Sequence, residues 1–265
     1  LTSGSSSSSS ADGTVIVVNV GVSDANVLKS VIGLADSKGT TYVSFGRTMI
    51  DDMVGIDVVE ISSGAGQNVA VFTEDTTSPT LVSFGLDLSM DIAVLSLTFD
   101  ESVHAGSLQV DQLRLQSVQD GSLGAHEFFV LTGGSVSSNN VTVVSVALTH
   151  GNLNSIKALA QLATRRENTF LSVGTLAIVD MNGNGVNTIS TNAAQLALVY
   201  VADITRPRLN AFDLNMNTGV LTLYLSETVK ASSVRQITFS LHSSSSLPIA
   251  SITLSGGSVS VLNAP

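Results

Sequence analysis

The chain has 265 residues, of which 43% are hydrophobic and only 12% are charged, so it has enough apolar material for one large or two ordinary cores. A formal net charge of −10, with 11 scattered basic residues, leaves no patch that could neutralise a phosphate backbone, which disfavours nucleic acid and anionic membranes as partners. Zero cysteines exclude disulfides, thiolate metal sites and thiol catalysis.

The first residues are not typical of a chain start. The start Leu1-Thr2-Ser3-Gly4 has neither an initiator Met nor a signal peptide. No stretch of the chain approaches the roughly 18 apolar residues that are needed to span a bilayer. We therefore expect a processed chain, or one cut from a longer protein, with no membrane insertion. The serine run at residues 5–10 is either a flexible or glycosylated loop or a plain solvated linker.

Alternation of apolar and polar residues predicts short strands. Leu153, Ile156, Leu159 and Ala163 recur instead at helical spacing, which predicts one short helix within residues 149–163, with Thr149 or Asn152 as N-cap. About seven strands in roughly 125 residues is the size of an immunoglobulin-like sandwich. The predicted strands cover residues 81–88, 94–99, 113–115, 128–131, 141–148, 170–173 and 196–201.

An internal repeat extends through the whole chain. Residues 67–86 align with residues 195–214 at a spacing of 128 positions, and the alignment continues in both directions with one two-residue deletion. The predicted fold class is therefore all-β, in tandem immunoglobulin-like β-sandwich repeats of about 126–128 residues, each with one short helix. The matching pairs include Lys29/Lys157, Asp52/Asp180, Gly55/Gly183, Asp75/Asp203 and Pro79/Pro207, then Leu97/Leu223, Glu101/Glu227 and Leu115/Leu241 at a spacing of 126.

The repeat also predicts the domain boundaries. Residues 74–201 form one complete repeat, residues 1–73 hold only the later strands of a repeat, and residues 202–265 hold only the earlier strands. Half a sandwich exposes apolar faces and unpaired strand edges, so we expect residues 202–265 of one chain to complete a sandwich with residues 1–73 of a neighbour. Two other arrangements stay open: the chain's own ends could meet, or the repeats could continue along one longer polypeptide.

Three motifs carry a family resemblance. Asp75-Thr-Thr-Ser-Pro79, Leu97-Thr-Phe-Asp-Glu101-Ser-Val103 and Asp180-Met-Asn-Gly183-Asn184 resemble the bacterial Ig-like repeats of S-layer and large surface proteins. They are also similar to the long Ig-like repeats of mastigoneme-type surface proteins of algae and related protists. The resemblance implies surface architecture and no chemistry. The first unit departs from it, reading Asp52-Met-Val-Gly55-Ile at the third motif.

Motifs for catalysis are missing from the sequence. The four histidines lie far apart, and no nucleophile elbow, phosphate-binding glycine loop or HExxH helix occurs, so we expect no enzyme activity and no cofactor. Asp180, Asn182 and Asn184 offer oxygens at alternate positions, as at the start of a calcium loop, but without the later Glu of an EF-hand. An Asx/Gly turn between strands is the alternative interpretation, and we favour it.

Candidate modification sites are few. Asn140 begins the only Asn-x-Ser/Thr sequon, and Thr76, Thr77 and Ser78 precede a proline, where O-linked sugar is a weaker hypothesis. Plain exposed polar loops are the alternative. The sequence as a whole indicates an extracellular structural filament subunit that binds copies of itself, with covalent glycans as a further possibility. A spacer in an adhesin stalk is the second hypothesis, and a carbohydrate-binding module is the third.

Overall fold

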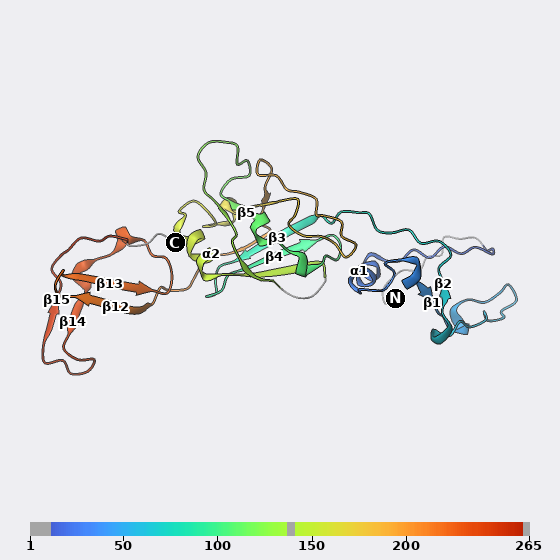
Figure 1. Ribbon diagram of the computed structural model, residues 1–265, viewed down its shortest axis with the longest axis horizontal. Coiled ribbons are helices and arrows are strands. Elements are labelled where there is room, and N and C mark those ends of the chain that lie inside the picture. Colours follow the sequence, from blue (N-terminus) through green and yellow to red (C-terminus); the bar gives the residue numbers. More distant parts are fainter. Residues whose placement is uncertain (1–11, 137–140, 262–265) are drawn as a thin grey trace.

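The computed structural model describes residues 12–136 and 141–261 as an elongated molecule of three consecutive units (Figure 1). The N-terminal unit is residues 12–73, the central sandwich is residues 74–201, and the C-terminal unit is residues 202–261. Strands predominate and only two α-helices are described, α1 Val22–Ser30 and α2 His150–Ala158, so the all-β prediction is confirmed. Neither of these helices is long and apolar enough to cross a membrane.

The central sandwich consists of two sheets. One sheet has the strand order β11-β3-β4-β8-β7 and the other has the order β10-β9-β5-β6. Neighbouring strands are antiparallel, except that β11 runs parallel to β3. The strands are β3 Leu81–Asp87, β4 Val94–Phe99, β5 Leu113–Gln116, β6 Phe128–Val130, β7 Gly134–Val136, β8 Val143–Leu148, β9 Phe170–Val173, β10 Gln195–Leu196 and β11 Val199–Val201.

One hydrophobic core lies between these two sheets. Alternate residues of β4 point inward, and Leu95, Leu97 and Phe99 are all at least 96% buried because successive side chains of a strand face opposite sides of the sheet. They join Leu115 of the other sheet in a single cluster whose buried members all lie between positions 81 and 197. The central sandwich therefore has a complete core of its own.

The structure of this unit differs from the sequence prediction at three places. The strand predicted over residues 196–201 is two strands, because the chain crosses between the sheets there: the amide of Ala197 donates to Thr169 and that of Leu198 donates to Phe84. Strand β7 was not predicted. The predicted helix and its Thr149 cap are confirmed, but the helix ends at Ala158, and Ala163 adopts φ of 50°, outside the right-handed helical region.

The N-terminal unit repeats the later half of the central sandwich. Its strands β1 Tyr42–Val43 and β2 Gln67–Asn68 pair in the register of β9 and β10, 128 positions on. Helix α1 has the bounds of α2 at the same spacing. Several residues that face the core in the central sandwich have exposed equivalents here, because the earlier strands of a repeat are missing beside them: Leu171 is 0% exposed and Val43, its equivalent, is 54% exposed.

The C-terminal unit repeats the earlier half. The hairpin of β12 Leu209–Asn215 and β13 Val220–Leu225 has the register of β3 and β4, including the irregularity at its first pair. The hairpin of β14 Ser240–His242 and β15 Ser251–Thr253 has the register of β5 and β6. Phe84 is 1% exposed in the central sandwich, whereas Phe212, its equivalent, is 53% exposed.

Short 3-10 turns complete the secondary structure. Most of them also recur at the repeat spacing, which shows that local backbone geometry is duplicated together with the sequence. They are Lys38–Thr40, Arg47–Met49, Ser63–Ala65, Ala105–Ser107, Val110–Gln112, Arg166–Asn168, Ala231–Ser233 and Gln236–Thr238.

Equivalent substitutions in complete and half-complete units should differ in cost. Leu86 is 0% exposed and Leu214, its equivalent, is 41% exposed. In the monomeric chain, Leu86→Ala should lower the free energy of unfolding by about 2–5 kcal/mol, because it leaves a cavity in the core. Leu214→Ala should cost less than about 1 kcal/mol. Denaturant unfolding followed by circular dichroism measures both values, and equal losses would contradict this assignment of the core.

Candidate functional site, a duplicated junction between units

A lysine at the end of helix α1 joins the N-terminal unit to the central sandwich. The Nζ atom of Lys29 lies 2.7 Å from Oδ2 of Asp75 and 2.5 Å from Oε2 of Glu101. Beside this pair, the hydroxyl of Ser102 donates to the backbone carbonyl of Asn26 at 2.8 Å. Helix α1 is thus held to the next unit by one ammonium group and one hydroxyl.

The same contacts recur between the central sandwich and the C-terminal unit. The Nζ atom of Lys157 lies 2.8 Å from Oδ2 of Asp203 and 2.5 Å from Oε2 of Glu227. The hydroxyl of Thr228 donates to the carbonyl of Asn154 at 3.0 Å, and its amide donates to Oδ1 of Asn154 at 3.0 Å. We call each of these two groups a lysine junction.

Local backbone structure orients the lysine and both of its carboxylate partners. Lys29 lies in the last turn of α1, where the helix dipole favours a positive charge. Asp75 accepts the backbone amide of Thr77 at 3.1 Å, and Asp203 accepts that of Thr205 at 3.0 Å, so the same Asx turn orients both carboxylates. The glutamates lie two positions after the last residues of β4 and β13, which places them at the ends of the central and C-terminal units.

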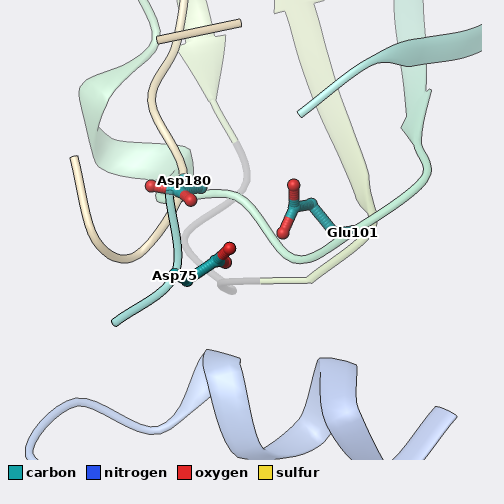
Figure 2. A group of neighbouring side chains, drawn as sticks. All are labelled: Asp75, Glu101 and Asp180. Carbon is teal, nitrogen blue, oxygen red and sulfur yellow. The ribbon is translucent and has the colours of Figure 1, made fainter. Parts of the chain in front are cut away.

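A third carboxylate completes the first junction. Ligand atoms of Asp75, Glu101 and Asp180 all lie within 4.8 Å of one another, and Figure 2 shows the three side chains converging above helix α1. Asp180 is 2% exposed and is held by the amides of Asn182 at 2.9 Å and Asn184 at 2.7 Å. Lys29 supplies positive charge to the group of acidic side chains that could otherwise hold a metal.

The amide group of Asn184 has a structural role in this arrangement. Its Nδ2 atom donates to Oδ2 of Asp180 at 2.8 Å and to the carbonyl of Asp75 at 3.0 Å. The side chain therefore presents hydrogens toward the carboxylates, the opposite of what a metal ligand requires. Asn182 contributes its backbone amide to the same turn. Of the three weak candidates for calcium ligands, Asp180, Asn182 and Asn184, the acidic group includes only Asp180.

The ion pairs change the protonation of their members. Burial by itself would lower the pKa of Lys29, but Asp75 and Glu101 outweigh it, so its pKa is raised above 10.5. Burial by itself would raise the pKa of Asp75, yet the bonds from Lys29 and Thr77 lower it below 3.8. Burial raises the pKa of Glu101 above 4.5 in spite of Lys29. Lys157 and Asp203 shift in the directions of Lys29 and Asp75 for the same reasons.

The predicted modification sites lie apart from the junction chemistry or at its edge. Asn140 lies outside the described residues. Thr76 and Thr77 are exposed and Ser78 is half-buried, in the linker before β3. The hydroxyl of Thr77 donates to Oδ1 of Asp75, so it belongs to the turn that orients this carboxylate.

The sequence aligns the junction residues at the repeat spacing but does not show that they contact one another. Glu101 was interpreted as a solvated strand end, whereas it is 8% exposed and paired with Lys29. A signal was present, because an acid and a base recur together at the repeat spacing in a chain with only 12% charged residues. What the sequence could not give is which of these charges meet across a unit boundary.

Removing one lysine should loosen one junction. We expect Lys157→Met to speed amide exchange at Thr228 by about tenfold to a hundredfold, because it leaves two partly buried carboxylates without their counter-ion. The control is Arg208→Met, which removes a 3.4 Å pair with Asp91 whose side chains are 72% and 68% exposed. Such exposed pairs contribute little, so exchange should barely change. Equal effects of the two variants would contradict the proposed role of Lys157.

Lowering the pH should open the lysine junctions, because it protonates their carboxylates. Because the pKa of Asp75 is lowered from 3.8, its contribution to docking is full above that value and is lost as the pH falls through the lowered pKa. Because the pKa of Glu101 is raised, its ionisation disfavours docking as the pH rises above 4.5. At the alkaline end, the contribution of Lys29 is lost only as the pH rises above 10.5. The protection factors of the α1 amides, in which the intrinsic pH dependence of exchange is divided out, should therefore stay constant through the neutral range and fall at either extreme of pH. Undocking within that range would refute this assignment.

No family model, curated protein or solved structure matches this chain. The interpretation of the junction therefore depends on its duplication within the chain itself.

Proposed function

We propose that this chain is a non-catalytic structural subunit of an extracellular filament or cell-surface fibril, built from tandem immunoglobulin-like repeats. The observation that carries the proposal is the duplicated lysine junction. Two successive unit boundaries use the same three contacts: a lysine paired with an aspartate, the same lysine paired with a glutamate, and a hydroxyl bound to a helix carbonyl.

Three equivalent contacts at successive boundaries favour a similar rotation and translation from each unit to the next. Repeating one such operation generates a straight or helical rod, the geometry of a solenoid or a filament. Directional ion pairs and hydrogen bonds suit this purpose, because they fix an angle between two bodies that have separate cores. An enzyme would not need two copies of one boundary.

The terminal units support head-to-tail assembly. The C-terminal unit has the backbone register of half a sandwich, and several of its core-facing side chains are exposed: Phe212 is 53% exposed, Leu209 is 52% exposed and Ile252 is 65% exposed. Apolar faces of this kind, rimmed by unpaired strand edges, are unfavourable in water and favour the addition of complementary strands. The partner of this subunit is therefore another repeat of the same kind.

Composition supports the extracellular location. A chain with 12% charged residues, no cysteine and many serines and threonines fits a surface protein held by packing and decorated at its loops. Covalent glycans at Asn140, or at Thr76, Thr77 and Ser78, belong to this proposal. The same rigid junctions would also suit the spacer of an adhesin stalk, which is the second candidate.

Removing the C-terminal unit should abolish assembly. A chain without residues 207–265 keeps the complete core of the central sandwich, so it should stay folded but form no filaments. Residues 207–265 added in trans should cap growing ends of the full-length chain. Negative-stain microscopy checks both results, and the full-length chain is the control. Normal filaments after the deletion would refute complementation, and beads on a flexible string would favour the adhesin stalk.

A further inference from the structure

We propose that residues 15–20 of a second copy of this chain add as an antiparallel strand to β13, and that Asp52 of that copy supplies the third carboxylate of the Lys157 junction. This inference rests on the proposed function and specifies the partner and its register. Each step below comes from comparing the terminal units with the complete central sandwich.

Strand β13 lacks the neighbour that its equivalent has. In the central sandwich, β4 pairs with β3 on one side and with β8 on the other. Among the described residues, β13 pairs only with β12. Its outer edge is therefore the place where an equivalent of β8 belongs, and unpaired edges are the usual site of strand addition.

Residues 15–20 are the equivalent of β8 within this sequence. They precede α1 by the same distance as β8 precedes α2, and all but Asn19 are hydrophobic. Ile16, Val18 and Val20 are 41%, 60% and 47% exposed. Their equivalents in β8, Val144, Val146 and Leu148, are 0%, 0% and 3% exposed and pack against β4.

The register follows from the central sandwich. Ser96 lies opposite Ser145 in the pairing of β4 with β8, and Leu95 lies opposite Val146. At the equivalent positions of the terminal units, Thr222 of one copy lies opposite Val17 of the next copy, and Leu221 lies opposite Val18. The apolar faces of both segments then point to one core, and a shift of one residue would turn the inserted face toward solvent.

The Asp52 loop already has the conformation that the junction needs. The amides of Val54 and Ile56 each donate to Oδ1 of Asp52 at 2.9 Å, as the amides of Asn182 and Asn184 donate to Asp180. Gly55 has φ of 83° and Gly183 has φ of 91°, which a residue with a side chain rarely adopts.

This loop should dock where its equivalent does. Asp180 forms a bridge to Val103, the residue two positions after Glu101. Val229 follows Glu227 in the same way, so Asp52 of the second copy would lie beside Val229 and close the group of Lys157, Asp203 and Glu227.

A second copy is favoured over closure within one chain. Strands β12–β15 lie at one end of the elongated molecule and α1, β1 and β2 lie at the other, with the central sandwich between them (Figure 1). For one chain's ends to meet, at least one lysine junction would have to open. Joining different copies leaves both intact, and a head-to-tail contact of this kind continues as a filament.

Disulfide trapping in the 265-residue chain tests the register, because the native sequence has no cysteine. The β4–β8 bonds from Phe99 to Thr142 and from Leu148 to Ala93 make Ser96 and Ser145 a non-hydrogen-bonded pair, in which the two side chains come close together. Val17→Cys with Thr222→Cys should therefore give a ladder of covalent oligomers under oxidation and a single monomer band after reduction.

Matched pairs make the result specific. Ser96→Cys with Ser145→Cys should oxidise within one chain and run as a monomer. Val18→Cys with Thr222→Cys places the sulfurs on opposite faces and should give no ladder. Asp52→Cys with Val229→Cys should give a second ladder and so tests the loop independently. Circular dichroism of each reduced variant checks that the fold is retained.

The outcomes separate this inference from the proposed function. Filaments without a Val17–Thr222 ladder would overturn the register and leave the structural role standing. A Val17–Thr222 disulfide confined to monomers would overturn the second copy as partner. If no filaments and no ladders form at any concentration, both the register and the proposed function fail.

Discussion

An ammonium group shared by two carboxylates fixes how each unit of this protein meets the next. Removing such charges from water costs free energy, and the cost is offset only when the geometry is good and the other hydrogen-bonding groups are satisfied. Here Lys157 and Glu227 are 10% and 11% exposed and 2.5 Å apart, and Thr228 binds helix α2 beside them. The boundary is therefore polar and directional, so it specifies orientation more than it adds stability.

The polar boundary separates the core of the central sandwich from the terminal units. The buried cluster is confined to positions 81–197, and no described residue of the terminal units belongs to it. The terminal units nevertheless pair their strands in the register of the complete sandwich. Hairpin register depends on turns and irregularities close in sequence, as between β12 and β13. Burial depends on distant strands, and under the proposed function these would come from another repeat.

The proposed joint between copies differs from the internal boundary in one respect. The side-chain amide of Asn184 binds the third carboxylate and also donates to the carbonyl of Asp75 at 3.0 Å. The side-chain amide of Asn187 donates to the carbonyl of Ser78, in the same linker as Asp75, at 3.2 Å. The equivalent residues of the first unit are Ile56 and Val59, which have no side-chain donor. A joint made by the first unit would keep the ion pairs and lose these amide bonds, so it is the natural point at which a filament would separate.

The sequence by itself determined the strands, the repeat and its spacing. Apolar alternation gave β3, β4, β5 and β8 within a residue or two, and Thr149 was correctly proposed as a helix cap, because these features depend on neighbours in the chain. Only the tertiary structure decided that residues 196–201 divide between two sheets, and that Lys29 meets Asp75 and Glu101. Those outcomes depend on how separate elements stack in space. Lys29 and Glu101 are 72 positions apart, and no local pattern states which charges such stacking will bring together.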